Sequence, residues 1–97
     1  MAEIQVHVDY SGQLRTAAGC GAATVEVAEG TSLRGLLNRL VADAPPLGPH
    51  LFSDAGGVQP SLLLVVNGAA VPSGEAAKRV TLARGDRVSL MPPVAGG

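Results

Sequence analysis

The sequence has few of the residues that several common functions require. Only two of its 97 residues are aromatic, Tyr10 and Phe52, so nucleic-acid bases would find no aromatic platform for stacking. The formal net charge is −1, and the seven lysines and arginines are spread along the chain. This charge pattern argues against a nucleic-acid surface or a patch for anionic membranes. The single cysteine, Cys20, excludes an internal disulfide bond.

Targeting and catalytic signals are also missing. The first residues lack the basic start and apolar block of a signal peptide, and no apolar run reaches the roughly 18–20 residues that cross a bilayer. No phosphate loop, metal cluster or catalytic pair is visible, and no basic residue flanks Cys20 to stabilise a thiolate. We therefore expect a cytoplasmic protein that binds no membrane, nucleic acid, metal or cofactor and is not itself an enzyme.

Alternating residues predict an N-terminal hairpin. Apolar side chains recur at every second position over residues 4–10, and residues 24–28 follow the same pattern. We expect the intervening residues 11–21, which are rich in glycine and small side chains, to form the connection. The first two strands would then be antiparallel neighbours.

One helix is predicted in the middle of the chain. Leucines from Leu33 onward fall at helical spacing, and Thr31 or Ser32 can cap the first turn. The helix should end near Ala44 because Pro45 and Pro46 follow it. We expect residues 45–60 to be irregular, with Leu51 and Phe52 packed onto the core as one short helical turn.

The remaining strands are predicted in the second half of the sequence. Residues 62–66 are continuously apolar, Asn67-Gly68 is a hairpin-turn signal, and residues 69–71 resume the strand pattern. Residues 80–82 read as a weak strand or a bend, and residues 87–91 as the last strand.

This order of elements predicts an α+β fold. The apolar stripe of the helix is buried most simply against one side of a mixed four- or five-stranded sheet. A right-handed crossover would make the first and last strands parallel neighbours. We therefore expect a ubiquitin-like β-grasp domain over residues 1–91, with one main helix. One face of the sheet would stay uncovered as a candidate partner surface, with Met91 beside it.

Residues 92–97 are predicted to form a flexible, extended tail. Proline disfavours helix, and Gly96 and Gly97 have no Cβ, so this backbone can pass through a narrow slot. When extended, the five residues from Pro93 to Gly97 reach roughly 15–18 Å. We expect the α-carboxyl of Gly97 to be the reactive group, ionised at neutral pH because its reference pKa is roughly 3.3–3.7.

Several segments carry a resemblance to a known family. They are Tyr10 to Gly19, Gly30 to Leu33, Val65 to Gly68, Gly85 to Val88, and Pro92 to Gly97. Together they resemble the MoaD/ThiS group of sulfur carriers nearly end to end. The Gly-Asp turn, the following strand, the two prolines and the terminal Gly-Gly are most similar to the small subunit of molybdopterin synthase.

This resemblance implies a chemistry and a set of partners. The carboxylate of Gly97 would be adenylated with ATP by a ubiquitin-activating-type adenylyltransferase and converted, with a sulfurtransferase, to a thiocarboxylate. The chain would then act as a co-substrate, or as a non-catalytic subunit whose Gly96-Gly97 end enters a larger catalytic subunit or a sulfur-accepting synthase. The expected partner-binding residues are Met91, Pro92, Pro93, Val94, Ala95, Arg84 and Arg87.

The acceptor of the sulfur stays open at this point. Molybdopterin synthesis is the favoured pathway, and cysteine, thiamine, tRNA thiolation and natural-product synthesis are alternatives within the same class. A ubiquitin-like modifier joined to lysines through Gly97 is a hypothesis of a different class. A plain β-grasp binding module is the third, and it predicts that removal of Gly96 and Gly97 has no effect.

Overall fold

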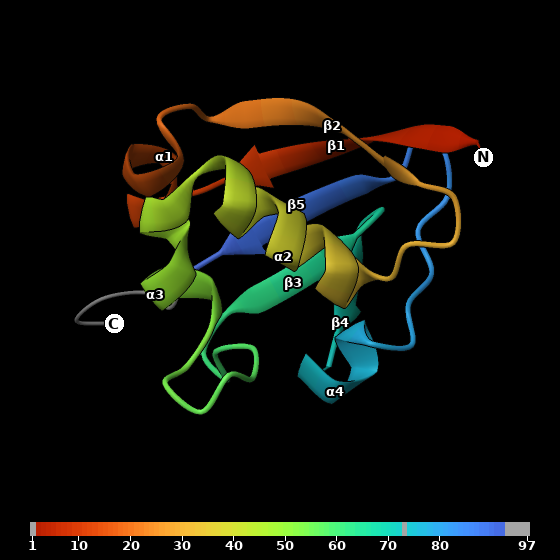
Figure 1. Ribbon diagram of the computed structural model, residues 1–97. Coiled ribbons are helices and arrows are strands. Elements are labelled where there is room, and N and C mark those ends of the chain that lie inside the picture. Colours follow the sequence, from red (N-terminus) through yellow and green to blue (C-terminus); the bar gives the residue numbers. More distant parts are fainter. Residues whose placement is uncertain (1, 73, 93–97) are drawn as a thin grey trace.

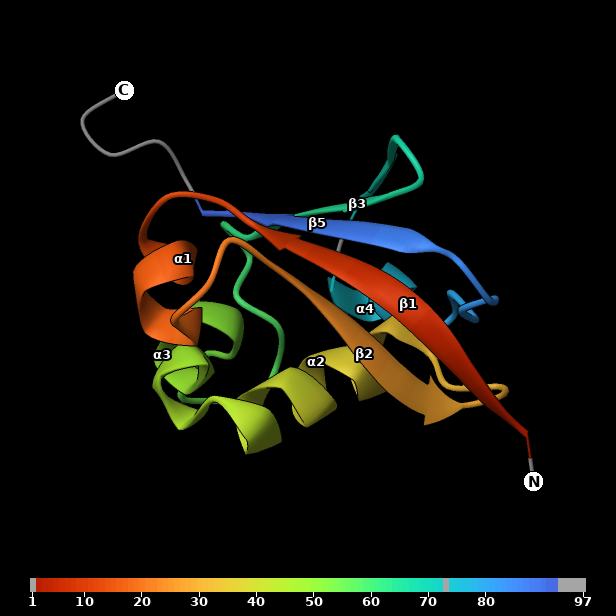
Figure 2. The ribbon, with the colours of Figure 1, turned by 90° about the horizontal axis from the view of Figure 1, so that it is seen from above.

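The computed structural model describes residues 2–72 and 74–92 of the chain. They form a five-stranded mixed sheet with helices packed against one face (Figures 1 and 2). The strands are β1 (Glu3–Tyr10), β2 (Ala22–Ala28), β3 (Leu63–Val66), β4 (Ala69–Val71) and β5 (Arg87–Met91). Their order across the sheet is β2-β1-β5-β3-β4, so the last strand lies in the centre.

The helical layer is built around one element. The helices are α1 (Gln13–Ala18), α2 (Leu33–Asp43), the 3-10 turn η1 (Pro45–Leu47), α3 (Gly48–Leu51) and α4 (Gly74–Ala77). Ser32 caps α2, because its Oγ accepts a hydrogen bond from the Gly35 N–H at 3.1 Å. The predicted main helix and its cap are therefore confirmed.

The core lies between α2 and the sheet. Four leucines of α2 are buried, and they belong to the same apolar cluster as the inward-facing residues of β1 and β5. These residues are Leu33, Leu36, Leu37, Leu40, Val6, Val8, Val88 and Leu90. Each buried leucine stabilises the fold by about 1.5–3 kcal/mol through the hydrophobic effect. This packing confirms the predicted burial of the α2 stripe on one side of the sheet.

The strand register confirms that the first and last strands are parallel neighbours. β1 and β5 are parallel, from His7 opposite Arg87 to Tyr10 opposite Leu90. β1 is antiparallel to β2, and β3 is antiparallel to both β4 and β5. The ubiquitin-like β-grasp layout expected from the order of elements is therefore the one observed.

Three segments differ from the sequence prediction. The connection at residues 11–21 contains helix α1, which is anchored by the buried Leu14 and ends at Gly19, where φ is 82°. Helix α4 was not predicted, and its only buried residue is Ala77. The prediction missed both helices because each has one buried apolar residue and so lacks a helical period. Residues 80–82 form no strand and make only an isolated bridge between Thr81 and Ser32.

Within the described part of the chain, no helix combines the length and the apolar character that crossing a membrane requires.

Candidate functional site

The base of the predicted tail lies at the end of β5. The strand ends at Met91, and Pro92 is the last residue that the structure describes. The β1–α1 connection passes beside it, since the Ser11 N–H donates to the Leu90 carbonyl at 3.2 Å. Five predicted site residues lie outside the described residues: Pro93, Val94, Ala95, Gly96 and Gly97.

Gly12 is a residue at this base that the sequence analysis did not single out. Its φ is +57°, and a Cβ built there would lie 3.1 Å from Cγ of Pro92. Glycine is therefore favoured over other residues for two reasons. The backbone is left-handed at this position, and Pro92 leaves little space for a side chain. The sequence signal was a Ser-Gly pair directly after a strand, which indicates a turn but not a contact with residue 92.

A mainly apolar strip runs along the uncovered face of the sheet to this base. The helices lie on the opposite face, as Figure 2 shows. Leu63 and Met91 are register neighbours with 44% and 36% of their surface exposed, and they are the exposed large hydrophobic residues of the described chain. Val65 and Ser89 form the next pair along the strands and are half-buried. We call Leu63, Val65, Ser89 and Met91 the outer strip.

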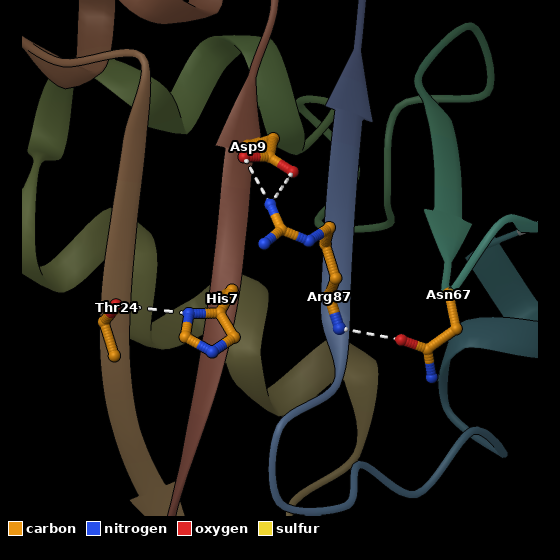
Figure 3. A network of polar contacts seen from close by, with 5 residues as sticks. All are labelled: His7, Asp9, Thr24, Asn67 and Arg87. Atoms are coloured by element: carbon orange, nitrogen blue, oxygen red, sulfur yellow. Dashed lines mark hydrogen bonds and ion pairs between the residues drawn. The ribbon is translucent and has the colours of Figure 1, made fainter.

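Polar pairs occupy the neighbouring part of this face (Figure 3). Nη1 of Arg87 lies 3.0 Å and 3.3 Å from the two carboxylate oxygens of Asp9. Nδ1 of His7 lies 3.3 Å from Oγ1 of Thr24. Arg87, a predicted partner-binding residue, therefore lies on the same face as the outer strip, with its charge compensated by Asp9.

Two of the segments that carry the family resemblance, residues 65–68 and 85–88, meet at the start of β5. The side chain of Asn67 donates to Oδ1 of Asp86 at 2.9 Å and accepts from the Arg87 N–H at 2.9 Å. The second carboxylate oxygen of Asp86 accepts from the Ala83 N–H at 2.8 Å. We call this arrangement of Asn67, Asp86 and Arg87 the turn clip; it fastens the β3–β4 turn to the start of β5.

The length of β5 separates the predicted partner-binding residues into two groups. Met91 and Pro92 lie at the end of the strand, whereas Arg84 precedes it and lines the same surface hollow as Gln5. Arg87 is the first residue of the strand. The motif residues Asn67 and Asp86 have structural partners in the clip, which the sequence resemblance alone did not reveal.

Tyr10 and Cys20 are the titratable groups on either side of α1. Burial raises the pKa of the Tyr10 phenol to about 12, with smaller contributions from the negative charges of Cys20 and Asp43. Cys20 is exposed in the turn after α1. Among the described residues, no group of three histidines, cysteines or carboxylates is placed to hold a metal ion.

Comparison with known proteins extends these observations. The family model described as the ThiS family matches residues 8–97. Small archaeal modifier protein 1 of Haloferax volcanii is 33% identical over 84 residues, which span 87% of this chain and 91% of that protein. The crystal structure of SAMP1 from the same organism matches with a TM-score of 0.84 at 28% identity, covering 96% of this chain and 99% of that one.

Two further solved structures have the same fold. A Pyrococcus furiosus protein described as a molybdopterin converting factor, subunit 1, matches with a TM-score of 0.75 at 26% identity, covering 94% of this chain and 99% of that one. A chain of the Amycolatopsis orientalis BexX/CysO complex matches with a TM-score of 0.72 at 25% identity, covering 95% and 99%.

Proposed function

The chain belongs to the ThiS family of small ubiquitin-like carrier and modifier proteins, and from this premise we propose that it carries sulfur as a thiocarboxylate on Gly97. The observation that carries the proposal is the extent of the family match, which includes Gly96 and Gly97. The chain supplies the carboxyl group, and partner proteins supply the catalysis.

The chemistry follows from the poor reactivity of a carboxylate. A nucleophile attacking it directly would have to expel an oxide. ATP converts the Gly97 carboxylate to an acyl-adenylate and releases pyrophosphate. A sulfur nucleophile then attacks the carbonyl carbon, the bond to the phosphate oxygen breaks, and AMP leaves. With hydrosulfide as the nucleophile, the S–H proton passes to solvent, and the product is a thiocarboxylate that holds one sulfur atom for transfer.

The outer strip is the surface that we propose for the adenylating enzyme. It carries two exposed apolar side chains and lies next to Pro92, so an enzyme that covers Leu63 and Met91 would hold the residues after Pro92 close to its own active site. The likeness to a chain of the BexX/CysO complex supports binding of a partner by this fold. A sulfurtransferase and a sulfur-accepting synthase would be the other partners.

Molybdopterin synthesis is the acceptor pathway that we favour. The Pro-Pro approach to the Gly-Gly end and the likeness to the Pyrococcus furiosus protein support it. The chain would then supply dithiolene sulfur to a pyranopterin precursor on a larger catalytic subunit. Cysteine, thiamine, tRNA thiolation and natural-product synthesis use the same carrier chemistry with other acceptors.

Protein modification is the second candidate. The relative that is 33% identical to this chain is named a modifier protein, which favours this candidate. The Gly97 adenylate, or a thioester derived from it, would then pass to a lysine amine and form an isopeptide bond. Both candidates require an activated Gly97 and differ in the nucleophile that takes the acyl group.

The test is the intact mass of the purified chain after incubation with ATP, a cognate adenylating enzyme and a sulfide source. We expect one oxygen to be replaced by sulfur, within the tryptic peptide 88–97 that follows Arg87. A chain without Gly96 and Gly97 is the control and should not change. Lysine-linked conjugates in place of the thiocarboxylate would favour the modifier. An unchanged mass with an enzyme of demonstrated activity would contradict both candidates.

A further inference from the structure

The chain contains a single side-chain amine. Its seven basic residues are one lysine, Lys78, and six arginines. An arginine guanidinium stays protonated at all accessible pH values and does not act as an amine nucleophile. Apart from the α-amino group, Lys78 is therefore the one place where an activated acyl group can be attached to this chain through an amide bond.

Lys78 is held in place by its backbone while its amine stays accessible. It directly follows α4, whose Ala77 is fully buried in the core. The Lys78 N–H donates to the Glu75 carbonyl at 3.3 Å. The side chain is 53% exposed, and its Nζ lies 3.3 Å from Oε1 of Glu75, which is itself 78% exposed. An ion pair this exposed is weak, so it does not sequester the amine.

The position of α4 leaves the candidate functional site clear. The helix packs against α2 and β4, on the side of the sheet that the helices cover. Figures 1 and 2 both show it well apart from the end of β5, where Met91 and Pro92 lie. A group attached at Lys78 therefore lies away from the outer strip and from the base of the tail.

We propose that Lys78 is the acceptor through which copies of this chain are joined to one another, so that all such linkages are Gly97–Lys78 isopeptide bonds. The inference rests on the proposed function, because Gly97 has to be activated first. The neutral Lys78 amine attacks the carbonyl carbon of the Gly97 adenylate. The new C–N bond forms, the bond to the phosphate oxygen breaks, AMP leaves, and the amine proton passes to solvent. ATP is the co-reactant.

Linkage at this position permits extension. The acceptor copy keeps its own outer strip and its own residues 92–97, so the adenylating enzyme can bind and activate it in turn. Each copy offers one acceptor amine, so the product is an unbranched chain of one linkage type.

The experiment uses the full chain with ATP and the adenylating enzyme that forms the thiocarboxylate, with the sulfide source omitted. Trypsin then leaves residues 88–97 of the donor on the acceptor lysine, because Arg87 is the last cleavage site. Cleavage after a modified Lys78 is blocked, so the acceptor peptide covers residues 40–79. Mass spectrometry of this branched peptide locates the bond.

The matched variant is Lys78→Arg, which keeps an exposed cation beside Glu75 and removes the amine. We expect covalent dimers from the wild type and a loss of at least about tenfold in the variant. In a parallel reaction that contains the sulfide source, both proteins should give an equal yield of thiocarboxylate. The double variant Lys78→Arg/Arg79→Lys returns an amine one residue along and should restore dimers.

Three results would overturn the inference. One is an equal dimer yield from Lys78→Arg, with the branch on the α-amino group. The second is an absence of wild-type dimers under conditions in which the thiocarboxylate forms; this result leaves the proposed function standing. The third is the absence of both products with an active enzyme, which removes the proposed function and this inference together.

Discussion

Replacing Asn67 with alanine tests the turn clip. The change removes both side-chain hydrogen bonds of the clip, one to Asp86 and one from the Arg87 N–H, each 2.9 Å long. It also places alanine at a backbone position whose φ is +50°, which asparagine adopts more readily than other side chains. Two separable effects should therefore add in this variant.

The expected loss of stability follows from these two effects. Each hydrogen bond contributes about 0.5–1.5 kcal/mol, and because both are exposed we take the lower half of that range, about 1–2 kcal/mol for the pair. The left-handed backbone costs alanine about 1 kcal/mol more. The free energy of unfolding should fall by about 2–3 kcal/mol, which lowers the Tm by about 10–20 °C in a domain of this size.

Asn67→Gly is the matched control, because glycine tolerates positive φ but makes neither side-chain hydrogen bond. Urea denaturation should give a cost about 1 kcal/mol smaller for glycine than for alanine. Amide hydrogen exchange at Arg87 should accelerate in both variants. The reasoning would be refuted if Asn67→Ala cost less than about 0.5 kcal/mol, or if Arg87 exchange stayed at the wild-type rate. Thiocarboxylate formation should persist in the folded variants, since the clip lies at the far end of β5 from Met91.

Three further predictions concern the base of the tail and its surroundings. The pKa of Tyr10, the single tyrosine, is about 12, so between about pH 10 and 12 the unfolded chain loses a proton that the folded chain keeps. Stability should fall over that window, and phenolate absorbance should show one transition near its upper end; a transition near pH 10 would contradict the burial argument. Gly12→Ala and Gly19→Ala both place alanine at positive φ, but only Gly12 approaches the tail, so only its variant should slow thiocarboxylate formation by the folded chain. Leu63→Gln on the outer strip should raise the KM for the adenylating enzyme about tenfold, whereas Ala42→Gln on the exposed side of α2 should not change it; equal KM values would exclude the strip as the docking surface.

The sequence was sufficient to predict the elements with a clear period. Apolar residues alternate from Ile4 to Tyr10, and leucines recur at helical spacing in α2. Each pattern indicates one buried face, and burial of that face stabilises the strand or the helix. The position of β5 beside β1 followed from the handedness of the crossover. The fold class was therefore accessible without coordinates.

The features that the sequence did not reveal depend on contacts between distant segments. Asn67 and Asp86 were visible as parts of two motifs, but their hydrogen bond forms only once β3 and β5 are paired. The approach of Gly12 to Pro92 likewise requires the assembled sheet. Leu63 belongs to a run that is apolar throughout, and only the register shows which of its side chains face outward. The roles of Gly96 and Gly97 remain predictions, because these residues lie outside the described part of the chain.

The central position of β5 has a consequence for how the protein folds. β1 covers residues 3–10 and its parallel neighbour β5 covers residues 87–91, so most of the described chain lies between these two paired strands. Contacts between such distant segments form slowly, because the intervening chain must first be brought together at an entropic cost. The sheet is therefore expected to close late in folding. A chain cut before Arg87 loses its central strand together with the predicted reactive end, so it should fail to fold and should not occupy an activating enzyme without carrying sulfur.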